Sequence, residues 1–115
     1  MNTVNTTEKL ILLATMIETG YGVRVTHTGR VYRRYVELSR LAGVEPVTQR
    51  RTLDVLKNLA GMGILWVKAT SLGRHGRTTV VKLLAPPQAL CQELAEDLLV
   101  GEIAEEICRN ASHPH

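Results

Sequence analysis

The 115-residue chain contains no phenylalanine, and one tryptophan and three tyrosines are its only aromatic residues. Proteins that bind single-stranded nucleic acid by stacking bases on aromatic side chains depend on such rings. Long apolar segments are also missing, because the longest apolar run spans residues 10–14, whereas a membrane helix needs roughly 20 such residues. The N-terminus lacks the basic and apolar regions of a signal peptide. We therefore expect neither a membrane protein nor a secreted one.

Cysteine is scarce as well, and the two that occur, Cys91 and Cys108, lie in one C-terminal segment of helical pattern. We interpret them as buried or free thiols of a reducing compartment. Their separation, together with His113 and His115 in the tail, does not match the ligand spacing of a zinc site. The phosphate-binding pattern Gly-x-x-x-x-Gly-Lys-[Ser/Thr] is absent too. No metal or nucleotide cofactor is therefore expected.

The charges that are present are unevenly distributed along the chain. Residues 24–82 contain twelve Lys or Arg against three acids, a balance of +9, whereas residues 83–115 contain one Arg against six acids, a balance of −5. The net charge of +3 conceals this contrast. A basic middle followed by an acidic end indicates a polyanionic partner for the middle segment. A solvated charged face is the simpler alternative.

The hydrophobic and charged contents, 44% and 22%, are those of an ordinary globular chain, and the length suits one domain, residues 1–115. Apolar spacing, capping residues and glycines predict the elements in order. We expect helix 5–19 begun by an Asn5/Glu8 capping box, strand 23–26, helix 29–42 capped by Thr28 and ended by Gly43, helix 49–61 capped by Thr48, a hairpin of strands 64–70 and 78–84, and a helix from Pro86-Pro87 to about residue 109. Trp66, Tyr32 and Tyr35 are interpreted as packing residues.

Two helices joined by a short turn and followed by a hairpin describe a winged helix-turn-helix, an α+β fold that is mostly helical. The recognition helix is expected at about 48–61, the wing at about 64–84 and a C-terminal helix at about 87–109. The second helix of such a pair enters the major groove of DNA, where base pairs differ in the groups they expose. The hairpin then reaches along the backbone or into the minor groove.

The candidate DNA-binding residues fall where this fold would use them. In the helix, a stripe of Leu53, Leu56, Leu59 and Ala60 predicts that Arg51, Asp54 and Asn58 face outward, with Arg50 and Val55 at the borders. Gln and Arg side chains can form paired hydrogen bonds with adenine and guanine, and arginines favour a narrow minor groove. The predicted site is therefore Thr48, Gln49, Arg50 and Arg51 of the helix with Arg74, His75, Gly76, Arg77 and Thr78 of the wing.

Two sequence motifs also resemble a known family. Residues 45–51 read Glu-Pro-Val-Thr-Gln-Arg-Arg, residues 73–78 read Gly-Arg-His-Gly-Arg-Thr, and a Leu-Leu-x-Pro-Pro motif ends at Pro87. Together they resemble the C-terminal winged-helix domain of archaeal origin-recognition proteins over nearly the whole chain. The resemblance implies binding of double-stranded origin DNA, in the cytoplasm and associated with the nucleoid. Members of this family carry an AAA+ ATPase module ahead of the domain, so that module or other initiator subunits are the implied partners.

Other functions remain as alternatives. A transcriptional regulator could share the fold and dimerise through a C-terminal stripe of Leu90, Leu94, Leu98, Leu99, Ile103 and Ile107. A winged helix used for protein contacts would present the same basic face to an acidic protein. An enzyme is not expected, because Asp54 has no second carboxylate or histidine in register for acid–base chemistry.

Overall fold

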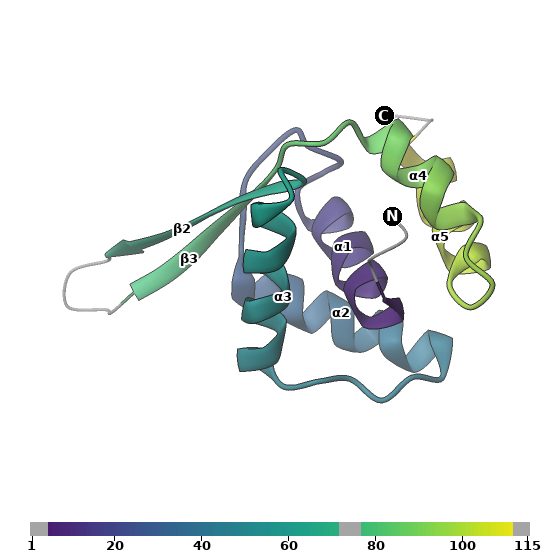
Figure 1. Cartoon of the computed structure of the whole chain (residues 1–115), viewed down its shortest axis with the longest axis horizontal. Helices are drawn as coiled ribbons and strands as arrows, with labels where there is room; N and C mark the ends of the chain where they lie inside the picture. Colours follow the sequence, from purple (N-terminus) through teal and green to yellow (C-terminus); the bar gives the residue numbers. More distant parts are fainter. Residues whose placement is uncertain (1–4, 72–76, 112–115) are drawn as a thin grey trace.

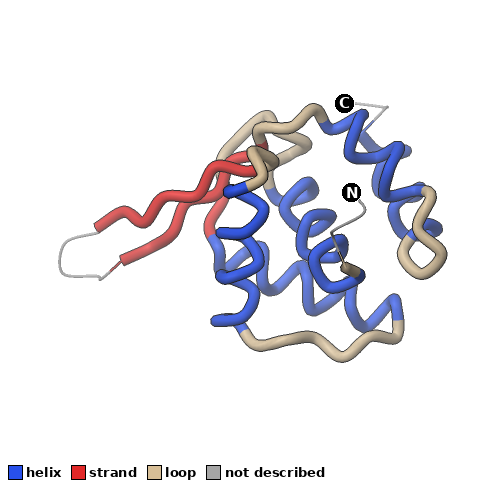
Figure 2. The backbone as a smooth tube through the Cα atoms, viewed as in Figure 1, coloured by secondary structure: helices blue, strands red, loops and turns tan. Residues whose placement is uncertain are grey.

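The computed structural model describes residues 5–71 and 77–111. In these ranges the elements follow one another as α1 (Thr6–Glu18), β1 (Thr26–His27), α2 (Thr28–Ala42), α3 (Gln49–Gly61), β2 (Leu65–Ser71), β3 (Arg77–Leu83), α4 (Pro87–Ala95) and α5 (Gly101–Ala111). The helices pack together, and β2 and β3 project from them as a narrow ribbon (Figure 1, Figure 2). The expected α+β winged helix-turn-helix is confirmed. None of the helices in the described ranges is long and apolar enough to cross a membrane.

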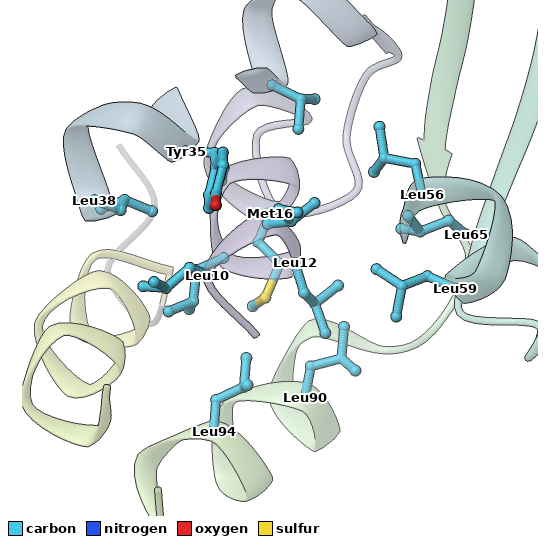
Figure 3. Packing of buried hydrophobic residues seen from close by; sticks show 14 of the residues in the cluster. Leu10, Leu12, Met16, Tyr35, Leu38, Leu56, Leu59, Leu65, Leu90 and Leu94 are labelled. Atoms are coloured by element: carbon cyan, nitrogen blue, oxygen red, sulfur yellow. The ribbon is translucent and has the colours of Figure 1, made fainter. Parts of the chain in front are cut away.

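Helix α1 lies at the centre of the hydrophobic core. The expected capping box is present, because the Asn5 side chain accepts from the Glu8 backbone and the Glu8 side chain reaches back to the Asn5 backbone. Seven consecutive residues of α1, 10–16, are buried, so the helix is enclosed on all sides instead of burying one broad face. Leu12 and Met16 lie between side chains of α2, α3, α4 and β2 (Figure 3).

Helices α2 and α3 form the helix-turn-helix, and local signals define most of their ends. Gly43 ends α2 in the left-handed conformation at φ 70°, which glycine adopts without a steric penalty. Thr48 caps α3 as expected. Thr28 does not cap α2, because it is the first residue of that helix and His27 occupies the capping position without a side-chain bond.

The three strands form one antiparallel sheet in the order β1-β3-β2. Register pairs run from Leu65 opposite Leu83 to Ser71 opposite Arg77. The short first strand lies later than expected, since Thr26 and His27 pair with Val81 and Val80. Successive residues of β2 point to opposite faces, so Leu65 is 1% exposed whereas Trp66 is 42% exposed. The expectation that Trp66 packs in the core is therefore wrong.

The C-terminal segment forms a hairpin of two helices, and the expected single helix to about residue 109 is wrong. Pro86 and Pro87 begin α4 as predicted, but α4 ends at Ala95 and α5 begins at Gly101. A Cβ on Gly101 would lie 2.7 Å from the Ala95 carbonyl oxygen, so glycine permits this close approach. Leu98 lies in the turn and is fully exposed, and Leu99 is half exposed. The stripe predicted to run through both leucines is therefore interrupted.

The hairpin also changes the interpretation of the cysteines, which form a disulfide between α4 and α5 instead of remaining as free thiols. In one continuous helix, residues 17 apart would be separated by about 25 Å along the axis. Because the segment folds back, the Cα atoms of Cys91 and Cys108 are 5.8 Å apart, within the range of a disulfide. The spacing alone carried no sign of this reversal.

Candidate nucleic-acid interface

The first turn of α3 gathers the four helix residues predicted to bind DNA. The Thr48 hydroxyl accepts a hydrogen bond from the Arg51 backbone N–H at 3.2 Å, and the buried Thr52 hydroxyl donates to the Thr48 carbonyl at 3.0 Å. Thr48, Gln49, Arg50 and Arg51 are all exposed. The first turn carries no acidic residue, so its two arginines add to the positive end of the helix dipole. This turn is a strongly positive, solvent-facing surface.

Two tyrosines of α2 fix the backbone from which α3 starts. The Val47 N–H donates to the Tyr35 hydroxyl at 2.9 Å, and the Tyr32 hydroxyl donates to the Val47 carbonyl at 3.2 Å. The Tyr35 ring is fully buried, and the two ring centroids are 6.2 Å apart. Both polar groups of the residue before the Thr48 cap are therefore held by the preceding helix. The sequence identified these tyrosines only as packing residues.

The buried face of α3 differs from the predicted stripe, and this shifts the outward face. Its buried residues are Thr52, Val55, Leu56 and Leu59, while Leu53 is only partly buried. With 100° between successive residues, the side opposite this set is centred near Arg50. Arg51 lies toward its flank. The prediction placed Arg50 at the border of the outward face, whereas the buried residues place it near the centre; Arg51 is exposed as predicted.

One cation on this face was counted in the charge balance but not assigned to the site. Lys57 is exposed and lies seven residues after Arg50, which places both on nearly the same side of the helix. Asp54 lies between them and is also exposed. The seven-residue spacing was the available signal for Lys57. The outward face of α3 thus presents Arg50 and Lys57 on either side of one carboxylate.

The wing is a regular ribbon as far as the described residues extend. β2 and β3 pair without interruption from Leu65–Leu83 to Ser71–Arg77, and the Thr70 hydroxyl donates to the Thr78 carbonyl at 3.3 Å. Of the predicted wing residues, Arg77 is the first residue of β3, and Thr78 is partly buried. Arg74, His75 and Gly76 lie outside the described residues. The paired strands β2 and β3 project away from the helices on the side of α3 (Figure 1).

The contrast of charge along the sequence becomes a contrast between two sides of the molecule. Helix α3 and the wing occupy one side, and α4 and α5, which follow residue 83, occupy the other (Figure 1). An ion pair connects the acidic side to α1, because Lys9 Nζ lies 2.6 Å from Asp97 Oδ2. The hydrogen bond from Lys9 and those from the Val100 and Leu99 N–H groups hold the pKa of Asp97 below its ordinary value. The acids of α4 and α5 therefore lie on the side of the molecule opposite α3, β2 and β3 (Figure 1).

A hydrogen bond connects α5 to the turn after α1. The Tyr21 hydroxyl donates to the Ile107 carbonyl oxygen at 2.9 Å, and burial raises the pKa of this hydroxyl, an effect that Arg34 partly opposes. Arg34 itself pairs with Glu18 at 2.9 Å and Glu37 at 3.2 Å. Because carboxylates already hold this guanidinium, Arg34 contributes less free positive charge than the arginines of α3.

Comparison with known proteins identifies relatives of most of the chain. Residues 1–93 match the family described as CDC6, C terminal winged helix domain. An ORC1-type DNA replication protein of Cenarchaeum symbiosum is 36% identical over 96 residues, which cover 84% of this chain and 22% of the relative. ORC1-type DNA replication protein 1 of Aeropyrum pernix is 38% identical over 95 residues, covering 83% and 24%. The chain thus spans about a quarter of the length of these relatives.

Solved structures agree with these sequence matches. The Aeropyrum pernix Orc1 protein, in a complex with DNA, superimposes with a TM-score of 0.81 at 37% identity, over 88% of this chain and 26% of that chain. Cdc6p from Pyrobaculum aerophilum superimposes with a TM-score of 0.61 at 16% identity, over 94% and 24%. The first of these structures is a complex with DNA. The second, at 16% identity, supports the fold alone.

Proposed function

The chain belongs to the Cdc6 C-terminal winged-helix family of ORC1-type replication initiators, and on this premise we propose that it binds double-stranded DNA at replication origins. The observation that carries the proposal is the capped first turn of α3, where Arg50 and Arg51 are exposed beside Gln49. The solved relative in complex with DNA supports the same function. The domain acts by binding, without a catalytic step of its own.

In this proposal α3 lies in the major groove with its first turn toward the DNA. The backbone N–H groups and positive dipole of a helix N-terminus favour a phosphate, and Arg50 adds a charge near the centre of the exposed face. Gln49 and Arg51 flank it and have the donor and acceptor geometry to contact adenine and guanine edges. Lys57 continues the positive surface along the groove. Asp54 disfavours a phosphate beside it, so that part of α3 faces base edges.

The wing supplies the second contact in this proposal. The predicted wing residues are Arg74, His75, Gly76, Arg77 and Thr78, and β3, which projects away from the helices (Figure 1), begins at Arg77. A narrow A·T-rich minor groove has the most negative potential and attracts arginine. One surface of the domain would thus contact two neighbouring grooves, and the acidic α4–α5 hairpin would face away from the DNA.

The rest of a full-length initiator is the proposed protein partner. The relatives are more than three times as long as this chain, and an AAA+ ATPase module ahead of the domain would account for much of that length. The domain would then deliver such a module, or other initiator subunits, to the origin. A transcriptional regulator of the same fold is less well supported, because the leucine stripe proposed for its dimer is interrupted at Leu98.

The test compares a preferred duplex with a random one. The purified chain is first used to select a preferred site from a pool of random duplexes, and affinities for both are then measured. If Gln49 or Arg51 contacts a base, its replacement by Ala costs about 1–3 kcal/mol on the preferred site and much less on random DNA.

Arg109→Ala is the matched control, because Arg109 is an exposed arginine on α5, away from α3 and the wing. It should change neither affinity. Equal losses of affinity on both duplexes for Gln49→Ala and Arg51→Ala would show that α3 binds DNA without sequence preference. A domain used only for protein contacts would show no preferred duplex at all.

A further inference from the structure

Two exposed apolar features contain none of the residues proposed to contact DNA. The first is Leu98, in the turn between α4 and α5, whose side chain is as exposed as in an extended peptide. The second is a hollow of about 330 Å³ on the sheet, lined by Val25, Trp66, Lys82 and Leu84. Because water solvates neither leucine nor an indole face favourably, both features suit an apolar contact.

The backbone that carries Leu98 is held on both sides. Asp97 Oδ1 accepts from the Leu99 and Val100 N–H groups, both at 2.8 Å, and Asp97 Oδ2 accepts from Lys9 Nζ at 2.6 Å. The Gly101 N–H donates to the Asp97 carbonyl at 2.9 Å. The leucine is therefore presented by an ordered turn, which lowers the conformational entropy lost on binding.

The hollow lies at the base of the wing on the face that points away from the core. Trp66 pairs in register with Lys82, and Val25 and Leu84 are about half exposed. Its lining thus combines three apolar side chains with one ammonium group and no carboxylate. Trp66 is the second residue of β2, at the end of the strand far from the connection between β2 and β3. An occupant here therefore lies at the opposite end of β2 from Ser71.

We propose that Leu98 of one copy inserts into the Trp66 hollow of a second copy, so that the domain associates head to tail. The charges are complementary, because exposed Glu96 and Glu102 flank the leucine turn and Lys82 lines the hollow. The α4–α5 turn lies on the side of the helices opposite the wing (Figure 1), so Leu98 fills another copy's hollow and not its own. Such a heterologous contact leaves one hollow and one leucine free at the ends.

A contact built on one leucine and a small hollow is weak in solution, since interfaces of low area form transient complexes. Neighbouring copies bound to one duplex would raise its occupancy through effective concentration. Self-association is therefore proposed in addition to DNA binding, and it does not require that DNA binding be correct. It is tested without DNA, so failure of either proposal leaves the other intact.

Sedimentation over a concentration series gives the first measurement. The wild-type chain should increase in weight-average mass with concentration, whereas Leu98→Ser and Lys82→Glu, both substitutions of exposed residues, should each weaken association at least tenfold. Leu41→Ser is the control, because Leu41 is a 74% exposed leucine on α2, and it should associate like the wild type. A monomeric wild type, or equal loss in the Leu41→Ser control, would overturn the proposal.

Mixing the two variants tests the head-to-tail arrangement. Leu98→Ser keeps an intact hollow and Lys82→Glu keeps an intact leucine, so an equimolar mixture should form dimers and nothing larger. Trp66 is the only tryptophan, and its fluorescence should shift with concentration in the wild type and in the mixture but not in Leu98→Ser alone. A mixture that remains monomeric, or the same fluorescence shift in Leu98→Ser, would contradict the arrangement.

Discussion

The hydroxyl of Tyr35 accepts a hydrogen bond from the backbone N–H of Val47 at 2.9 Å, one residue before the cap of α3. This contact makes the position of the proposed recognition helix depend on a buried side chain of α2. DNA contacts require side chains placed to within a fraction of an ångström. The hydrogen bond therefore links the packing of the core to recognition at the surface.

Replacing Tyr35 by Phe tests that link. The change removes the acceptor of the Val47 N–H while keeping the ring, so we expect the free energy of unfolding to fall by about 1–2 kcal/mol. Affinity for the preferred duplex should fall as well. Tyr21→Phe is the control, since it removes a hydroxyl that bonds to Ile107, far from α3. If both variants lose stability equally and neither loses affinity, Tyr35 does not position the helix.

The Asp97 carboxylate should make stability depend on pH in the acid range. Its hydrogen bonds with Lys9, Val100 and Leu99 lower its pKa in the folded chain below the ordinary value of 3.8. Its contribution is therefore present above the unfolded-state pKa and is lost as pH falls through the folded-state pKa. Asp97→Asn should be less stable than the wild type by about 1–3 kcal/mol at pH 7.

Below about pH 4 the difference between the two proteins should narrow, as followed by urea unfolding at several pH values. Glu106→Gln, which removes an exposed acid of α5, controls for the change in net charge. A difference between the wild type and Asp97→Asn that stays constant down to pH 2 would show that the charged form of Asp97 does not stabilise the fold.

The disulfide should stabilise the C-terminal hairpin. Closing a loop between residues 17 apart stabilises a fold by at most about 3 kcal/mol through the entropy of the unfolded chain. The double variant Cys91→Ser/Cys108→Ser should therefore unfold at a lower temperature than the wild type. Reductant should destabilise the wild type and leave the double variant unchanged. Two reactive thiols in the denatured, unreduced protein would contradict the bond.

The wing should contribute to affinity without contributing to stability. Replacing Arg74 and Arg77 together by Ala should weaken duplex binding and reduce the preference for A·T-rich DNA, because arginine in a narrow minor groove is lost. The unfolding temperature should be nearly unchanged. The comparison is with Arg109→Ala, which removes an exposed arginine from the opposite side. Wild-type affinity in the double variant would exclude the wing from the DNA surface.

The parts of the fold that the sequence predicted correctly depend on local chemistry. Asn5 with Glu8, Gly43 and Thr48 define helix ends through bonds or dihedral angles within a few residues of themselves. Such signals are readable without knowledge of the rest of the chain. The two helices and the hairpin follow from them, and so does the winged architecture.

The errors arose where contacts distant in sequence decide the outcome. The break between α4 and α5 is held by Lys9, 88 residues before Asp97, and the disulfide follows from that break. The burial of Val55 instead of Leu53 depends on how α3 lies against α1 and β2. The roles of Tyr32 and Tyr35 at Val47 required the geometry of the turn, because a tyrosine's spacing predicts burial but not the partner of its hydroxyl.

The central claim, that the α3 and wing side of the domain binds duplex DNA, is tested most directly by affinity across a salt series. If about five to seven phosphates are neutralised, the logarithm of the binding constant should fall with the logarithm of salt concentration with a slope of about −5 to −6. Arg50→Ala should reduce the magnitude of that slope by about one. A slope near zero for the wild type would contradict this claim, because binding would then neutralise no DNA phosphates.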